Sequence, residues 1–130
     1  MAQVYSVHAQ EGDLVLLGTD GVFDNLFDHE ICALANLALS PYEAEILGDP
    51  NKTTSAQAVA AAVAEAAAHK SRNPMAKTPF MKHARRAKTH FMGGKMDDIT
   101  VVACWVTCGA ETGAESGACH HATSGACASY

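Results

Sequence analysis

The sequence predicts an α+β fold in which antiparallel strands form a sheet and a pair of helices packs on it. Two apolar runs have the length and composition of strands, at residues 14–17 and 99–106. Between them, apolar residues recur at helical spacing over residues 29–39 and again over 56–70. The second helical segment is nearly all alanine, and small side chains allow close packing of a helix on a sheet.

Length and composition limit the class of protein. The 130 residues suffice for one modest core, and a hydrophobic content of 48% is ordinary for a globular domain. The net charge of −5 argues against a nucleic-acid partner, and no apolar run approaches the length of a membrane span. Five cysteines do not form a disulfide framework, and Cys32 and Cys104 are expected to be buried thiols.

The strands near the N-terminus are predicted to form a hairpin. Residues 3–7 are β-prone, residues 9–12 have the composition of a turn, and residues 13–18 form the second strand. The unbroken apolar run at 14–17 suits a strand that is buried on both faces. A breaker cluster at residues 18–21 ends this strand.

Two helices are expected between the strands. Asp28 can cap a helix that begins at His29 and ends before Pro41. Thr54 opens a capping-box pattern for the alanine-rich helix over residues 56–70, which is the clearest element in the chain.

Acidic residues stand at the ends of the two main strands. Asp20 and Asp24 follow the first strand, and Asp97 and Asp98 come directly before the last one. If these strands are adjacent and antiparallel, Asp20 and Asp97 lie at the same end of the sheet. Gathered carboxylates suit Mg²⁺ or Mn²⁺, which prefer oxygen ligands. The alternative is a plain strand–turn–helix junction in which Asp20 and Gly21 form the turn.

Together the two acidic stretches resemble the C-terminal half of the metal-dependent serine/threonine protein phosphatases, the PPM or type 2C family. The family pattern is Gly-Asp, an apolar run, Thr/Ser-Asp-Gly-x-x-Asp, a helical insert, and Asp-Asn/Asp-Ile/Met-Thr/Ser-Val. Thr78-Pro79-Phe80 and Gly93-Gly94-Lys95 resemble the small organelle-type branch of the family. The resemblance covers about residues 3–107, and the chain supplies Gly12-Asp13, Thr19-Asp20-Gly21-Val22-Phe23-Asp24 and Asp97-Asp98-Ile99-Thr100-Val101.

The resemblance implies a fold and an activity. The fold is a sandwich of two antiparallel sheets flanked by helix pairs, of which this chain holds about half the strands. The activity is hydrolysis of phosphoserine and phosphothreonine in proteins by a dinuclear Mg²⁺ or Mn²⁺ centre, with two or more ions in the complete domain. Asp20 and Asp97 would bind the dinuclear centre, and Asp24 an additional, weaker ion. Gly21 would allow the turn that aims Asp20, and Asp98 would support the ligands without binding metal.

The chain also departs from the family pattern. The family's bridging Asp, in an Asp-Gly-His-Gly-Gly motif, and its phosphate-binding Arg lie in an N-terminal half, and neither occurs here. Residues 1–107 are therefore interpreted as the C-terminal portion of a phosphatase domain, inactive alone, whose partners are the missing half and a phosphoprotein. By family branch the protein would be intracellular, in a mitochondrion or plastid. Two alternatives remain: a catalytically inactive, pseudophosphatase-like binding module, and a structural α+β domain.

Two further segments have distinctive compositions. Residues 73–92 are basic, which is typical of a solvated loop and short helix. The segment would alternatively be a flap beside the metal centre that meets a phosphorylated substrate. Residues 108–130 consist mainly of small residues that bury little apolar surface, so a disordered tail is predicted.

Overall fold

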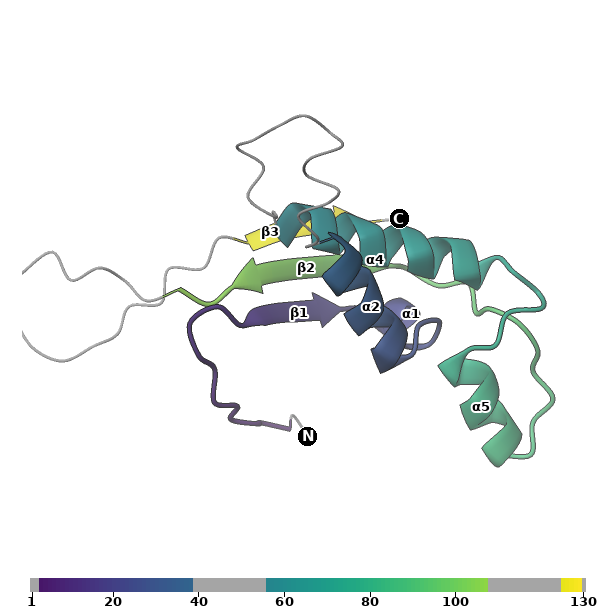
Figure 1. Ribbon diagram of the computed structural model, residues 1–130. Coiled ribbons are helices and arrows are strands. Elements are labelled where there is room, and N and C mark those ends of the chain that lie inside the picture. The colour runs from purple at the N-terminus through teal and green to yellow at the C-terminus, as the bar shows by residue number, and fades with distance from the viewer. Residues whose placement is uncertain (1–2, 39–55, 108–124, 130) are drawn as a thin grey trace, which may run out of the picture.

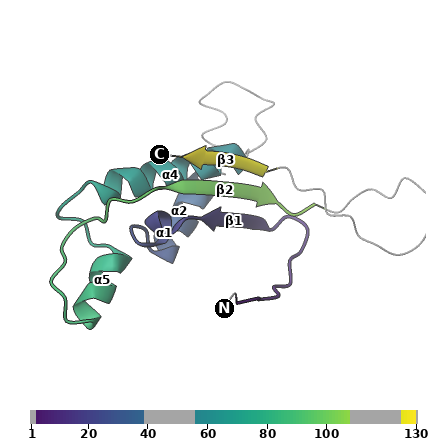
Figure 2. The same ribbon diagram turned by 180° about the vertical axis from the view of Figure 1, so that it is seen from behind.

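The computed structural model describes residues 3–38, 56–107 and 125–129 of the chain. The described strands are β1 (Leu14–Gly18), β2 (Thr100–Trp105) and β3 (Gly125–Ser129), which form one antiparallel sheet in the order β1-β2-β3. The described helices are α1 (Asp20–Phe23), α2 (Asp28–Ala38), α4 (Ala56–Ser71) and α5 (Pro79–Arg86). Helices α2 and α4 lie on one face of the sheet, and α5 stands beyond its end (Figures 1 and 2). The predicted α+β class is confirmed.

The pairing of β1 with β2 places the acidic segments at one end of the sheet. The register runs from Leu14 opposite Trp105 to Gly18 opposite Val101. One residue further on, the Thr19 N–H donates a hydrogen bond of 3.1 Å to the Thr100 carbonyl. The segment that follows β1 therefore lies beside the segment that precedes β2, as expected for adjacent antiparallel strands.

The predicted N-terminal hairpin is wrong. Residues 3–10 have no strand structure, and the side chains of Val4, Tyr5 and Val7 are exposed. The described pairing of β1 is with β2, which lies far away in sequence. A β-prone composition alone does not form a strand, because the segment gains stability only from a ladder and a buried face.

Burial of β1 on both faces is also not found within the described residues. Exposure alternates along the strand: Leu14 and Leu16 pack against the core, whereas Leu17 is 62% exposed and Val15 is 37% exposed. The helices cover one face of the sheet and leave the opposite face open. This alternation is usual for an antiparallel sheet with a single covered face.

Helix α4 supplies most of the core. Its face toward the sheet is fully buried and consists of small and β-branched residues: Val59, Ala60, Val63, Ala64 and Ala67. These side chains form one cluster with Val101 and Ala103 of β2. Alanine brings the helix close to the sheet, so the predicted packing of this helix is confirmed.

Helix α2 packs against α4 and is joined to it by an ion pair. The Lys70 Nζ lies 2.6 Å from Glu30 Oε1. Partial burial works against ionisation of Glu30, but the hydrogen bonds from Lys70 and from the Phe27 N–H outweigh it and lower the pKa of this carboxyl. Asp28 lies in the first turn of α2 rather than before it, and Glu30 is the side chain that reaches back to the entering backbone.

The C-terminal strand contradicts part of the predicted disorder. Residues 125–129 form β3, which pairs with β2 from Thr100 opposite Ser129 to Cys104 opposite Gly125. Such a segment needs no core of its own, because the open edge of β2 supplies its backbone hydrogen bonds. The rest of the predicted tail, the helix end before Pro41 and the capping box at Thr54 lie outside the described residues.

Exposure tests the expectation for the two described cysteines. Cys32 is exposed on α2 and Cys104 is half-buried on β2, so the prediction of buried thiols is wrong for Cys32. Among the residues that the structure describes, no helix is both long enough and apolar enough to span a membrane.

Candidate metal centre

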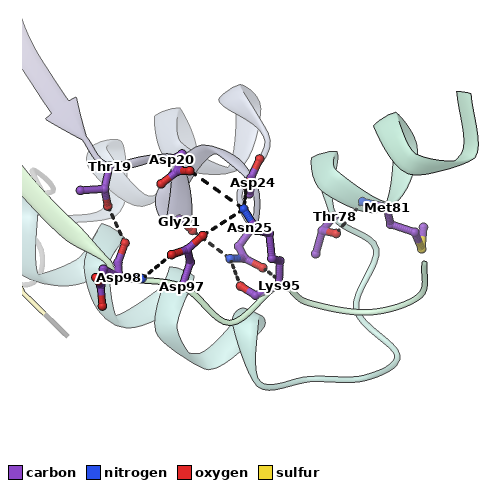
Figure 3. A network of polar contacts seen from close by, with 10 residues as sticks. All are labelled: Thr19, Asp20, Gly21, Asp24, Asn25, Thr78, Met81, Lys95, Asp97 and Asp98. Carbon is purple, nitrogen blue, oxygen red and sulfur yellow. Dashed lines mark hydrogen bonds and ion pairs between the residues drawn. The ribbon is translucent and has the colours of Figure 1, made fainter. Parts of the chain in front are cut away.

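Three carboxylates converge where β1 ends and β2 begins (Figure 3). Asp20 opens α1, and Asp24 follows one helical turn later, so both side chains project from the same side of this short helix. Asp97 comes from the segment that leads into β2. One oxygen of each carboxylate lies within 4.8 Å of the others. The structure therefore brings the three predicted ligands together.

The arrangement fits a hard divalent cation. Mg²⁺ binds oxygen at about 2.1 Å, so two oxygens on one ion lie at most about 4.2 Å apart. The three ligand atoms lie within 4.8 Å of one another, which is close to this limit. The side chain of Asp20 is 75% exposed, whereas those of Asp24 and Asp97 are 22% and 34% exposed. Water can reach such a site and complete the coordination that Mg²⁺ usually retains.

A lysine lies within this cluster, and the sequence motifs did not indicate its role. The Lys95 Nζ is 2.7 Å from Asp24 Oδ2, 2.9 Å from Asp97 Oδ2 and 4.0 Å from Asp20 Oδ2. Figure 3 shows the ammonium between the carboxylates. Lys95 belongs to a stretch that resembles the family, but a cation is not a metal-ligand type, so a search for ligands passes over it.

Electrostatic effects favour the charged forms of Lys95 and Asp97. Hydrogen bonds to Asp24 and then to Asp97 raise the pKa of Lys95 above its usual value. The hydrogen bond from Lys95, followed by that from the Asp98 N–H, lowers the pKa of Asp97. At neutral pH the ammonium is therefore protonated and the Asp97 carboxylate is ionised.

Asn25 fixes the backbone that carries Lys95. Its side chain is fully buried, and its Nδ2 donates hydrogen bonds of 2.8 Å to the carbonyls of Gly21 and Lys95. Its Oδ1 accepts from the Lys95 N–H at 2.9 Å. The Asn25 amide thus joins α1 to the segment that leads into β2. Sequence reasoning did not assign this role, since an Asn after an acidic loop is also typical of an exposed turn.

Gly21 and Asp98 contribute through the backbone. Gly21 lies inside α1, where a Cβ would stand 2.5 Å from the Asp98 carbonyl oxygen. The predicted tight turn is therefore replaced by a close approach of two backbones. The Thr19 Oγ1 donates to the same carbonyl at 2.7 Å, and the Asp98 N–H donates to Asp97 Oδ1 at 3.0 Å. Asp98 thus orients Asp97 by its N–H.

The basic segment lies beside the centre. Thr78 caps α5 by accepting from the Met81 N–H, and its hydroxyl donates to the Gly93 carbonyl. The Phe80 N–H donates to the Asp24 carbonyl at 3.0 Å, and the Lys95 Nζ lies 5.0 Å from the centre of the Phe80 ring. The predicted short helix is confirmed, and its N-terminal end contacts the backbone of the acidic cluster.

Comparison with known proteins identifies the class. The chain is 41% identical over 111 residues to probable protein phosphatase 2C 55 of Arabidopsis thaliana, and 38% identical over 105 residues to probable protein phosphatase 2C 80 of the same plant. The X-ray structure of the photosystem II phosphatase PBCP superposes with a TM-score of 0.55 at 30% identity. No protein-family model matches the chain.

These matches cover most of this chain but a minor part of each relative. They span 85% and 81% of the chain, but 21% and 23% of the two Arabidopsis proteins. For PBCP the match covers 78% of the chain and 38% of that structure. The chain is thus a relative of the type 2C protein phosphatases and spans about a fifth of the curated relatives it matches first. The resemblance of the chain to this family is confirmed.

Proposed function

We propose that this chain is the C-terminal portion of a Mg²⁺- or Mn²⁺-dependent phosphatase that hydrolyses phosphoserine and phosphothreonine in proteins. The observation that carries the proposal is the convergence of Asp20, Asp24 and Asp97 in a chain related to type 2C phosphatases. In such a centre, bound divalent ions lower the pKa of a water molecule and neutralise phosphoryl oxygens.

The protein residues would hold and orient this centre. Asp20 and Asp97 are proposed as ligands of the dinuclear centre, and Asp24 as the ligand of an additional ion. The Asp98 N–H orients Asp97, which is the kind of support that metal ligands usually receive from their neighbours. The close contact at Gly21 keeps α1, and with it Asp20, against the Asp97 segment.

A second half of the domain would complete the fold. The open face of the sheet exposes Val15 and Leu17, and the partly buried Val102 and Cys104 lie opposite them in the register. This apolar face suits a second sheet, as in the sandwich that the family resemblance implies. The missing bridging Asp and phosphate-binding Arg would come from the same half.

The basic residues on and near α5 are the ground on which we propose a phosphorylated protein partner. Five lysine and arginine residues lie from Lys77 to Lys88 inclusive, and they form no ion pair within the described parts of the chain. Their side chains are exposed, and the Phe80 N–H at the start of α5 donates to the Asp24 carbonyl in the acidic centre. A phosphoprotein bound at the centre would therefore meet positive charge next to it. The sequence does not identify the compartment, and the resemblance to the organelle-type branch is the ground on which we propose a mitochondrion or plastid.

The alternative function is a catalytically inactive, pseudophosphatase-like binding module. The absence of an Asp-Gly-His motif from the sequence favours it for this chain taken alone. Metal binding distinguishes the two functions. The phosphatase needs metal affinity at Asp20 and Asp97, whereas a binding module does not.

Calorimetric titration with Mn²⁺ tests the proposed centre. We expect wild-type chain to bind Mn²⁺, and Asp20→Asn and Asp97→Asn each to weaken binding by about tenfold or more, since each loses a charged oxygen ligand. Asp28→Asn is the matched control, because Asp28 is exposed on α2 outside the cluster. Equal affinity in all four proteins would remove the metal assignment and favour the binding module.

A further inference from the structure

The acidic centre contains a cation that belongs to the chain itself. Lys95 enters the centre from a fixed backbone position, since Asn25 bonds both its N–H and its carbonyl. Its neighbour Gly94 packs so closely on the end of α4 that a Cβ there would stand 2.1 Å from the Lys70 carbonyl oxygen. The root of the Lys95 side chain is therefore held in place, whereas its four-carbon stem is flexible.

The ammonium occupies the position between two proposed metal ligands. Its distances of 2.7 Å and 2.9 Å to Asp24 Oδ2 and Asp97 Oδ2 are those of charge-assisted hydrogen bonds. Asp20 Oδ2 is 4.0 Å away, so the ammonium belongs mainly to the other two carboxylates. An ion that takes Asp97 Oδ2 as a ligand in the dinuclear centre, or Asp24 Oδ2 as a ligand of the additional ion, would need an oxygen that the ammonium already contacts. Lys95 and such an ion cannot occupy this position together.

We propose that Lys95 is a tethered competitor of the divalent ion: its ammonium holds Asp24 and Asp97 together in the metal-free protein and leaves this position when the ion binds. This inference rests on the proposed metal centre and adds to it a residue that sets metal affinity. The ammonium lowers the repulsion among the carboxylates without metal, and it weakens metal binding because it must be displaced. A higher ion concentration is then needed to load the centre.

The test compares Mn²⁺ binding and thermal stability in three variants of the full chain. Lys95→Met removes the charge and keeps the length of the side chain, whereas Lys95→Arg keeps the charge. Lys82→Met is the control, because it changes the net charge by the same amount as Lys95→Met. Lys82 is exposed on α5 and forms no ion pair with the cluster within the part of the chain that the structure describes. Affinity is measured by calorimetry, and melting is followed with chelator and with saturating Mn²⁺.

We expect Lys95→Met to bind Mn²⁺ about tenfold more tightly than the wild type, because a positive charge near a divalent ion is unfavourable even in water. Lys95→Arg and Lys82→Met should stay close to wild-type affinity. In chelator Lys95→Met should melt below the wild type, since its carboxylates lose their counter-charge, and Mn²⁺ should raise its melting temperature by a larger increment.

The outcomes separate this inference from the proposed function. Unchanged or weaker Mn²⁺ binding in Lys95→Met, with binding intact in the wild type, would overturn the competition and leave the metal centre standing. A similar gain of affinity in Lys82→Met would reduce the effect to net charge and would also overturn it. Absence of binding in the wild type and in every variant would overturn both the metal centre and the competition.

Discussion

Asn25 shows how one buried amide can organise a site that it does not enter. Its three hydrogen bonds satisfy backbone groups of Gly21 and Lys95, which belong to segments far apart in the sequence. A buried amide that meets its partners this well adds rigidity, and an unpaired group in the same place is costly. The positions of Asp24 and Lys95 relative to each other therefore depend on Asn25.

Replacement of this amide should lower the stability of the chain. In Asn25→Ala the N–H and carbonyl of Lys95 lose their side-chain partner, and we expect a loss of about 2–3 kcal/mol in the free energy of unfolding. The melting temperature should fall by about 10 °C. Asn36→Ala, at an exposed position of α2, is the control and should melt as the wild type does. A melting temperature of Asn25→Ala within 2 °C of the wild type would contradict the role of Asn25.

The site was predictable from the sequence as far as ligand type and strand order determine it. The convergence of Asp20 and Asp97 follows from two strands with acidic ends and an antiparallel pairing. The positions of Lys95 and Asn25 depend instead on how α1 meets the segment before β2. That contact is set by tertiary packing at Gly21 and Gly94, and neither composition nor spacing encodes it.

At the scale of elements, the sequence patterns succeeded where an element has a strong local signal. The alanine-rich α4 and the apolar β2 were predicted because their periodicity and composition agree with their burial. The hairpin at residues 3–18 failed because residues 3–7 have a β-prone composition but bury no face, and they form no strand beside β1. Strand β3 was missed because five small residues carry no hydrophobic pattern, and its pairing depends on the open edge of β2.

Strand β3 should contribute to stability despite its small side chains. It pairs with β2 along its whole length and lies under α4, so its removal exposes the edge of β2 and part of the face of α4. A chain that ends at Ser124 should melt about 5 °C below the full chain, as expected for a loss of about 1–2 kcal/mol. Circular dichroism melting would measure this. An unchanged melting temperature would restore the prediction that the whole C-terminal tail is dispensable.

At the scale of the molecule, one face and one end of the described structure remain open. The sheet has helices on one face, and Val15 and Leu17 are exposed on the other. The acidic centre stands at the end of the sheet, with the exposed Asp20 at its outer side. Exposed apolar faces of this kind usually mark an interface. These two open surfaces are the ones that we propose a second half of a phosphatase domain covers.

The isolated chain is therefore expected to be inactive as a phosphatase. Asp20, Asp24 and Asp97 offer a partial set of ligands, and two like-charged ions need a bridging carboxylate to remain close together. Without the phosphate-binding Arg that the family resemblance places in an N-terminal half, the substrate phosphate also lacks a bidentate partner. Purified chain should not hydrolyse p-nitrophenyl phosphate with Mn²⁺, whereas addition of the N-terminal half of a type 2C phosphatase, fused or as a separate chain, should restore Mn²⁺-dependent turnover. The same half added to the Asp97→Asn chain is the control and should restore none. Turnover by the chain alone, abolished by Asp97→Asn, would show that the centre is complete without a second half.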